Sequence, residues 1–328
     1  MTMPMSRILI TRRIPESGLS IIREVAEIDV FEGDSPIPRD VLLNKIEGKD
    51  GLLCLLSDRI DKDVIAAGGE SLKVISNYAV GYNNIDIEEA TRRGILVTNT
   101  PGVLTDATAD LTWALLLACA RRIPISDRFV RDGKFVGWGP KLLLGREVYG
   151  KTIGIIGMGD IGTAVARRAI GFGMRILYHN RKRNLEAEKE LGAIYVTIEE
   201  LLRDSDFVSL HVPLSPQTRH LIGDREISQM KPTAILLNAS RGEVVDEHAL
   251  VEALRVGRID SAGLDVFENE PSLSPGLTEL ENVVVTPHTG SGTYQSRDRM
   301  AMMAAENLIA GLEGKRPPNL VNKSAWKD

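Results

Sequence analysis

The stretch "TIGIIGMGDIG", residues 152–162, decides the fold of this 328-residue chain. Its first half is an apolar run typical of a buried strand, and Gly157, Gly159 and Gly162 follow. The next residues, "TAVARRAIGFG", predict a helix. In such a strand–turn–helix unit the first glycine permits a tight turn, the second lets a pyrophosphate approach the backbone, and the third lets helix and strand pack closely. The stretch therefore indicates a dinucleotide-binding loop; the alternative is a tight turn that binds no ligand.

Short apolar runs alternate with amphipathic segments on both sides of this loop. Such alternation predicts right-handed βαβ units and parallel sheets. The alternation starts afresh after a long apolar helix and a glycine-rich loop at 132–151, so we expect an α/β protein of two doubly wound domains. The predicted strands are 7–11, 28–31, 51–56, 73–78, 95–98, 152–157, 174–179, 193–196, 207–211, 234–238, 261–265 and 283–285, and the predicted helices include 16–26, 39–47, 62–68, 86–93, 106–121 and 293–312.

The composition is that of a globular protein, with 43% hydrophobic and 26% charged residues. A formal net charge of −5 provides no overall basic field for nucleic acid or anionic lipid. Cys54 and Cys119 lie inside apolar runs, which favours buried thiols over a disulfide. The apolar stretch at the N-terminus is too short for a signal peptide, and the longest apolar helix is about half a membrane span. We expect a cytoplasmic protein with neither nucleic-acid nor membrane partners.

A basic segment, "YHNRKRN" (178–184), ends the strand that follows the glycine loop. An NAD site places Asp or Glu at this strand end, where the acid binds the ribose hydroxyls and repels a 2′-phosphate. Here the next acids are Glu186 and Glu188, and the strand end itself holds Asn180, Arg181, Lys182 and Arg183. Arginine and lysine suit a phosphate, although a solvated basic surface is the alternative. The segment predicts a preference for NADP(H), with NAD(H) bound more weakly.

Three later fragments, "NASRGEVVDE" (238–247), "GLDVFENEP" (263–271) and "TPHTGSGT" (286–293), each follow or end an apolar run. They therefore lie at carboxyl ends of parallel strands, where such sheets bind ligands. They contribute Arg241, Glu270 and His288. Reduction of a 2-keto acid needs a cation for the carboxylate and carbonyl and a proton donor for the developing alkoxide, and a histidine beside a carboxylate suits the second role. Taken singly, each residue also fits an ordinary turn or surface position. We find no spacing that predicts a metal site.

These motifs make the chain resemble the D-isomer-specific 2-hydroxyacid dehydrogenases, and within them the glyoxylate/hydroxypyruvate reductase branch. The resemblance covers nearly the whole chain and rests on "GMGDIG", "LHVPLSPQTRHLI", "MKPTAILLNASRGEVVDEHAL", "AGLDVFENEP" and "TPHTGSGT". The last motif departs from the family, which usually has an apolar residue in place of Thr289 and Ala in place of Gly292.

The resemblance implies a discontinuous, flavodoxin-like substrate domain of residues 1–100 plus 289–328 and a Rossmann dinucleotide-binding domain of residues 101–288. It also implies a homodimer built on the 106–121 helix and the glycine-rich loop. Trp138 in that loop could reach the partner's active site or serve dimer packing alone. The implied activity is NADPH-dependent reduction of glyoxylate, hydroxypyruvate or both. Alternatives are another D-2-hydroxyacid or phosphite dehydrogenase, and a non-enzymatic dinucleotide-sensing protein.

By the same resemblance, Arg241 anchors the substrate carboxylate and carbonyl, His288 is the acid/base and Glu270 is its partner. The substrate would also contact Leu55, the backbone of Val80 and Gly81, and Trp138. His211 would lie near the cofactor without chemical work, and Asp265 near its nicotinamide end. The implied cofactor-binding set is Gly157, Met158, Gly159, Asp160, Ile161, Gly162, Asn180, Arg181, Lys182, Arg183, His211, Val212, Pro213, Thr218, Ala239, Ser240, Arg241, Asp265, His288 and Gly290. The remaining histidines, His220 and His248, are expected in amphipathic helical stretches.

Overall fold

A computed structural model describes residues 5–327 of the chain. These residues form two compact units: one comprises the described residues up to Leu104 together with those from Gly292 onward, and the other comprises Thr105–Ser291. The boundaries expected from the sequence, 100/101 and 288/289, fall a few residues earlier in the chain. The structure confirms the predicted strands and helices, whose ends differ by no more than a few residues.

The first unit is built on a parallel sheet that has five strands within the described residues, in the order β2-β1-β3-β4-β5. This is the flavodoxin-like order. Leu52 and Ile75 pack against the helices of one face, whereas Gly51 and Val74 on the other face meet Leu308 and Gly311 of the last helix. The strands are β1 (Ser6–Ile10), β2 (Ala26–Val30), β3 (Gly51–Cys54), β4 (Val74–Asn77) and β5 (Leu96–Thr98), and the helices are α1 (Glu16–Arg23), α2 (Arg39–Lys45), α3 (Lys62–Ala67), α4 (Ile87–Arg92) and α12 (Tyr294–Leu312).

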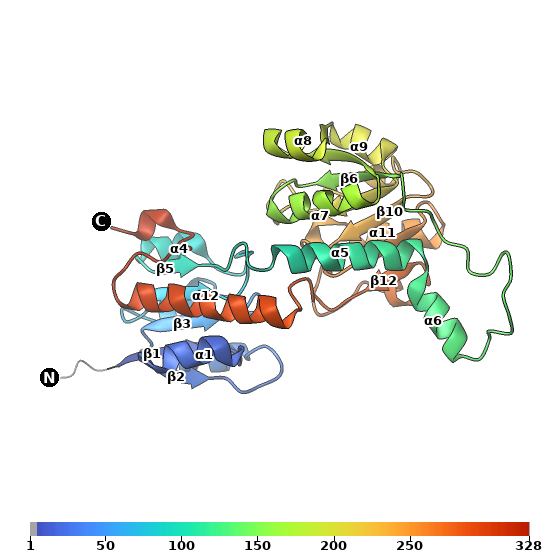
Figure 1. Cartoon of the computed structure of the whole chain (residues 1–328). Helices are drawn as coiled ribbons and strands as arrows, with labels where there is room; N and C mark the ends of the chain where they lie inside the picture. Colours follow the sequence, from blue (N-terminus) through green and yellow to red (C-terminus); the bar gives the residue numbers. More distant parts are fainter. Residues whose placement is uncertain (1–4, 328) are drawn as a thin grey trace. The chain divides into compact units, whose positions relative to one another are not determined.

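Helix α12 comes from the far end of the sequence but belongs to this unit, where it lies beside α1 and β3 (Figure 1). Gly18 of α1 allows this approach, since a Cβ atom there would lie 2.6 Å from the backbone oxygen of Ala301. The hydroxyl of Ser76 in β4 donates to the carbonyl of Ala304 across 2.9 Å. The chain therefore completes its first domain with its last helix.

The second unit carries a seven-stranded parallel sheet, within the described residues, of order β12-β11-β10-β9-β6-β7-β8. Read from β8, this is the Rossmann order with one further strand. Apolar side chains of alternating direction fill a core on each face, one with α5 and α7 and the other with α9 and α11. The strands are β6 (Thr152–Ile156), β7 (Arg175–His179), β8 (Ile194–Tyr195), β9 (Phe207–Leu210), β10 (Ile235–Asn238), β11 (Ser261–Leu264) and β12 (Val283–Val285), and the helices are α5 (Thr105–Ala120), α6 (Ile123–Arg131), α7 (Asp160–Gly171), α8 (Leu185–Leu191), α9 (Ile198–Asp204), α10 (Asp224–Ile227) and α11 (Glu247–Arg255).

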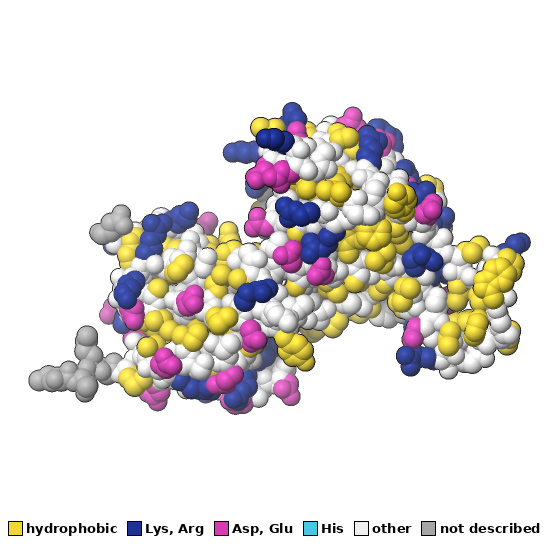
Figure 2. Space-filling view, in the orientation of Figure 1, with side chains coloured by type: hydrophobic (Ala, Val, Ile, Leu, Met, Phe, Trp, Pro, Cys, Tyr) yellow, Lys and Arg dark blue, Asp and Glu magenta, His cyan; other side chains and the backbone are white. Residues whose placement is uncertain are grey.

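Helix α6 and the chain that follows it, residues 123–149, extend away from the sheet of the second unit (Figure 1). We call this segment the arm. Hydrophobic side chains gather on it in the space-filling view (Figure 2), among them Val130, Val136 and Trp138, which are 58%, 99% and 86% exposed. Exposure of so much apolar surface to water is energetically unfavourable. Among the residues described, no helix has both the length and the apolar character needed to cross a membrane.

Candidate active site and cofactor-binding loops

The glycine loop joins β6 to α7 in the geometry that the sequence predicts. Gly157 has a φ of +103°, and a Cβ there would lie 2.6 Å from the carbonyl of His211. A Cβ on Gly162 would lie 2.1 Å from the backbone oxygen of Gly157, so close packing of helix and strand excludes a side chain. At Gly159, in contrast, a Cβ would meet nothing within 4 Å. Space is open where a pyrophosphate would approach the first turn of α7, so the loop fits a dinucleotide.

The basic segment follows β7, and we call residues 180–184 the basic loop. The side chain of Asn180 turns toward the glycine loop, where its Oδ1 accepts the Met158 amide at 2.6 Å. Asn184 donates to the Met158 carbonyl at 3.0 Å. Arg181 and Lys182 are exposed and form no ion pair with any residue in 5–327. The loop is therefore fixed to the glycine loop by two amides, while two cations remain available to an anion.

Arg183 differs from its neighbours because an acid already binds it. Its Nε donates to Glu188 Oε1 at 2.9 Å and its Nη2 to Oε2 at 2.5 Å. Its guanidinium also lies 5.9 Å from the centre of the Tyr195 ring. The sequence placed Arg183 among the phosphate-binding cations without indicating this pairing.

The three candidate catalytic side chains come from neighbouring strand ends of the second sheet. Arg241 follows β10, Glu270 lies in the segment after β11, and His288 follows β12. The Nδ1 atom of His288 lies 2.9 Å from Glu270 Oε2 and 3.2 Å from Oε1. Glu270 is itself oriented by the amide of Phe267, which donates to Oε1 at 3.0 Å. The structure thus brings the predicted histidine and its predicted carboxylate into direct contact.

The electrostatics of this group connect all three side chains. Burial raises the pKa of Glu270, but the hydrogen bond and charge of His288 outweigh it and hold the pKa below its ordinary value, with a further contribution from Arg241. Burial lowers the pKa of Arg241, and the charges of Glu270 and Glu243 oppose that effect. The Arg241 cation and the hydrogen-bonded His288–Glu270 pair thus lie in one partly buried site. This set can bind a carboxylate and deliver a proton beside it.

His288 stands in a segment with unusual backbone geometry, which a buried acid stabilises. Its φ is +52°, a left-handed conformation that is uncommon for residues other than glycine. The carboxylate of Asp265, only 1% exposed, accepts the amides of Thr289 and Gly290, both at 2.7 Å, and the hydroxyl of Thr286 at 2.6 Å. The His288 amide donates to the backbone oxygen of Asp265 at 2.8 Å. We call residues 286–290 the catalytic loop, and Asp265 is its anchor.

A second turn is organised by Asn238, which is not among the site residues predicted from the sequence. The Oδ1 atom of Asn238 accepts the amide and the hydroxyl of Ser240, at 3.1 and 2.8 Å. Its Nδ2 donates to the carbonyl of Arg241 at 2.8 Å. This closes the 238–241 turn that aims Arg241. Its position as the last residue of a buried strand, just before the motif, was the available signal.

In the first unit, the predicted carboxylate-binding segment is held by its carbonyl groups. Asn99 donates to the backbone oxygen of Val80 and Asn77 to that of Gly81, both at 2.8 Å. Asn84 bridges Asn77 to the backbone oxygen of Leu55, which lies on the neighbouring loop. With these carbonyls fixed, the backbone at Val80 and Gly81 is held in one conformation, as a binding turn requires.

The remaining predicted residues fall into supporting positions. His211 follows β9, its Nε2 lies 2.8 Å from the Ser209 hydroxyl, and burial lowers its pKa to about 4, so it carries no charge at neutral pH. The Thr218 hydroxyl donates to the carbonyl of Pro213 at 2.7 Å and closes the turn that also holds Val212. Asp160 and Ile161 begin α7, Ala239 lies in the 238–241 turn, and a Cβ atom added at Gly290 would lie 3.2 Å from Asp265 Oδ2.

The prediction for one histidine is wrong. His220 does not lie on a helix but in a turn with a φ of +50°, and its Nε2 binds Glu268 Oε1 at 2.6 Å. The amphipathic spacing around His220 belongs to a turn, and the chain that follows it forms a β-bridge between Ile222 and Val245. His248, in contrast, lies on α11 and is exposed, as expected. Both cysteines are free and buried, as predicted, and burial raises the pKa of the Cys119 thiol to about 11.

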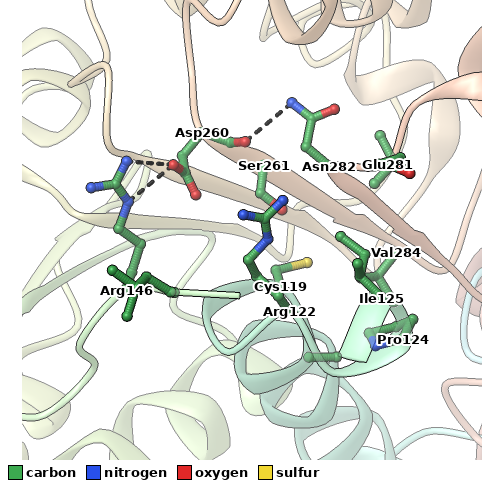
Figure 3. A pocket seen from close by; sticks show the side chains of 14 residues that line it. Cys119, Arg122, Pro124, Ile125, Arg146, Asp260, Ser261, Glu281, Asn282 and Val284 are labelled. Carbon is green, nitrogen blue, oxygen red and sulfur yellow. Dashed lines mark hydrogen bonds and ion pairs between the residues drawn. The ribbon is translucent and has the colours of Figure 1, made fainter. Parts of the chain in front are cut away.

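A cavity of about 430 Å³ lies at the opposite edge of the second sheet, around the first residues of β11 and β12 (Figure 3). Cys119 and Arg122 reach it from the end of α5, and Arg146 crosses to Asp260 with a 2.9 Å bond from Nε. None of the predicted catalytic or cofactor-binding residues lines it. Its lining includes Pro124 and Leu144 from the arm.

Comparisons with known proteins agree with this geometry. A family model described as "D-isomer specific 2-hydroxyacid dehydrogenase, NAD binding domain" matches residues 113–290. The chain is 55% identical over 321 residues to the glyoxylate reductase of Thermococcus litoralis, with 97% of each chain covered. It is 54% identical over 325 residues to that of Pyrococcus furiosus, covering 98% of this chain and 96% of the relative.

Solved structures extend the likeness to the whole fold. An NADPH-dependent glyoxylate/hydroxypyruvate reductase from Sinorhizobium meliloti, solved with NADP and malonate, is 32% identical with a TM-score of 0.87, and 99% of each chain is covered. A protein from Thermus thermophilus is 48% identical with a TM-score of 0.91 over 96% of this chain and 99% of that one. The loops, the strand-end side chains and these relatives together place the chain in the D-isomer-specific 2-hydroxyacid dehydrogenase family, in its glyoxylate reductase branch.

Proposed function

We propose that the protein is an NADPH-dependent reductase of small 2-keto acids, converting glyoxylate, hydroxypyruvate or both to the 2-hydroxy acid. The observation that carries this proposal is the His288–Glu270 contact at 2.9 Å, beside Arg241 and on the same sheet edge as the glycine loop. The glyoxylate reductases among its relatives support the substrate class. A small substrate suits the 79–81 segment, whose sequence "AVG" offers no cation for a second charged group.

The chemistry divides between the cofactor and the residues of this chain. The nicotinamide, when bound, supplies the hydride. Arg241 binds the substrate carboxylate and polarises the carbonyl. His288 uses Nδ1 for Glu270, so its Nε2 is the nitrogen that delivers the proton to the forming alkoxide. Glu270 stabilises the protonated imidazole and fixes its orientation.

The preference for NADP(H) rests on the basic loop. Asn180 stands where an NAD enzyme places an acid, and its side chain is bound to Met158 rather than free for a ribose. Arg181 and Lys182 are exposed beside it and suit a 2′-phosphate. The NADP-containing structure of the Sinorhizobium meliloti relative is consistent with this cofactor. NAD(H) would bind without these two contacts and therefore more weakly.

The arm supports a homodimer. Its exposed apolar side chains, including Val136 and Trp138, need a covering surface, and a second copy offers the same surface in return. Trp138 would lie in that interface or reach the partner's substrate. The predicted cytoplasmic location stays a prediction. Sedimentation or light scattering tests the dimer, and a monomer at micromolar concentration would contradict it.

The experiment that tests the function is a panel of 2-keto acids with NADPH, followed by the loss of absorbance of the reduced nicotinamide. We expect glyoxylate or hydroxypyruvate to be reduced with the highest kcat/KM, and chiral analysis to identify D-glycerate as the product from hydroxypyruvate. No oxidation of NADPH by any member of the panel, together with tight NADPH binding, would instead support a dinucleotide-sensing protein.

A further inference from the structure

The cations of the basic loop are not equivalent, because one of the three is already paired. Glu188 binds the Nε and Nη2 atoms of Arg183 with both of its carboxylate oxygens. The edge of a guanidinium that carries Nε and Nη2 also binds phosphate, through two parallel hydrogen bonds. A phosphate that approached Arg183 would therefore meet a carboxylate already in place.

Glu188 is not a mobile surface acid. The hydroxyl of the buried Tyr178 donates to its Oε1 at 2.5 Å, and the same hydroxyl accepts the Asn184 amide at 2.8 Å. The Glu188 side chain is 18% exposed, whereas that of Arg183 is 58% exposed. The acid thus belongs to the framework under the basic loop, and the more exposed arginine folds back onto it.

The charge of Glu188 persists over the whole working range of pH. The hydrogen bonds from Arg183 and Tyr178 hold the pKa of Glu188 at about 2. At neutral pH the three cations of the basic loop therefore lie beside one fixed anion, Glu188, which contacts Arg183. Glu188 compensates most of the charge of Arg183, whereas no acid among the described residues pairs with Arg181 or Lys182.

We propose that Glu188, positioned by Tyr178, is a specificity-determining residue that limits how strongly the basic loop selects the 2′-phosphate of NADPH. This inference rests on the proposed cofactor preference and deepens it. Glu188 acts in two ways: it occupies an edge of Arg183 that a phosphate would use, and it adds a negative charge that repels a phosphate. Neither effect bears on NADH, which has a hydroxyl at that position.

The test is Glu188→Gln in the full-length protein. Glutamine keeps an oxygen that can accept from Tyr178 or Arg183 but removes the charge. At low salt we expect KM for NADPH to fall about three- to ten-fold, while kcat and the KM for NADH stay within about two-fold of the wild type. The gain should shrink as ionic strength rises.

Two further variants separate the pairing from general electrostatics and from folding. Glu186→Gln makes the same change in net charge on the same helix, at an exposed residue for which no bond to Arg183 is found. We expect it to leave the ratio of the two KM values nearly unchanged. Arg183→Gln combined with Glu188→Gln removes both members of the pair, and KM for NADPH should return close to the wild-type value.

The outcomes test the role of Glu188 and the proposed cofactor preference separately. An unchanged or raised KM for NADPH in Glu188→Gln overturns the role of Glu188, and so does an equal gain in Glu186→Gln. The wild-type ratio of kcat/KM for NADPH and NADH, measured in the same series, tests the cofactor preference itself. A wild type that prefers NADH would contradict the proposed cofactor, but the role of Glu188 would stand if Glu188→Gln shifted the ratio toward NADPH.

Discussion

The catalytic loop and the basic loop both follow strands of the same sheet, yet they are stabilised in opposite ways. The catalytic loop is fixed by Asp265, a buried carboxylate that accepts two amides and a hydroxyl and so holds His288 at a positive φ. The basic loop is fixed to the glycine loop by the amide side chains of Asn180 and Asn184, while the side chains of Arg181 and Lys182 lie in solvent. Proton transfer requires the His288 side chain at a fixed position, whereas selection of a phosphate requires only positive charge near the phosphate. Changes in the first loop should therefore cost far more activity than changes in the second.

The largest effect is expected at the proton donor. His288→Asn removes the imidazole while keeping a polar side chain of similar reach, and we expect kcat for glyoxylate reduction to fall by about 10²–10⁴. Binding of NADPH, followed by fluorescence, should change little. His248→Asn, at an exposed histidine on α11, is the matched control and should retain wild-type activity. If His288→Asn retained most of its activity, another group would have to deliver the proton.

The next effect concerns the anchor of the catalytic loop. Asp265→Asn preserves shape, but an Nδ2 group in place of one carboxylate oxygen cannot accept: at the Oδ2 position it faces the Gly290 amide, and at the Oδ1 position it faces the Thr289 amide and the Thr286 hydroxyl. Each lost bond inside the protein costs about 1–3 kcal/mol, so we expect a lower Tm and a kcat reduced at least ten-fold. Asp260→Asn, just before the amino end of β11, replaces a solvent-accessible acid that binds Arg146 and should cost much less. Equal losses in the two variants would contradict the anchoring role.

A third effect appears as a shift in pH dependence. Glu270 has a lowered pKa, held down by the hydrogen bond and charge of His288, so it is a carboxylate at neutral pH. Glu270→Gln removes this negative charge from beside the Nδ1 atom of His288. The alkaline limb of the kcat/KM profile for reduction should move to lower pH, measured between about pH 5 and 10. A limb that does not move would show that Glu270 orients His288 without influencing its protonation.

The smallest effect is expected in the basic loop. Arg181→Gln with Lys182→Gln removes the two unpaired cations, and KM for NADPH should rise about ten-fold at low salt with little change in kcat. KM for NADH should stay nearly constant. Because both side chains are exposed, Tm should not change. A loss as large as that of His288→Asn would remove the distinction between the two loops.

Much of this architecture is predictable because its signals are local. A buried strand followed by Gly157, Gly159 and Gly162 determines both a turn and a packing distance, and neither depends on the rest of the chain. The same holds for the strand ends that carry Arg241 and His288. Parallel strands bring their carboxyl ends to one edge, so residues far apart in the sequence could be assigned to one site.

The sequence could not predict the direction in which some side chains point or the residues with which they pair. The anchoring role of Asp265 depends on such a direction, because its carboxylate accepts the amides of Thr289 and Gly290, 24 and 25 residues later in the sequence. The pairing of Arg183 with Glu188 depends on where α8 begins and on a tyrosine hydroxyl beneath it. His220 was placed on a helix because its spacing is amphipathic, yet a turn satisfies the same spacing.

The role of the basic loop is tested most directly by the ratio of kcat/KM for NADPH and NADH, measured with glyoxylate in one buffer of low ionic strength. We expect a ratio of at least about ten in favour of NADPH, since two unpaired cations each contribute to binding the 2′-phosphate. We also expect the ratio to fall as salt is added. A ratio of one or less, or a preference for NADPH that salt leaves unchanged, would contradict the role assigned to the basic loop.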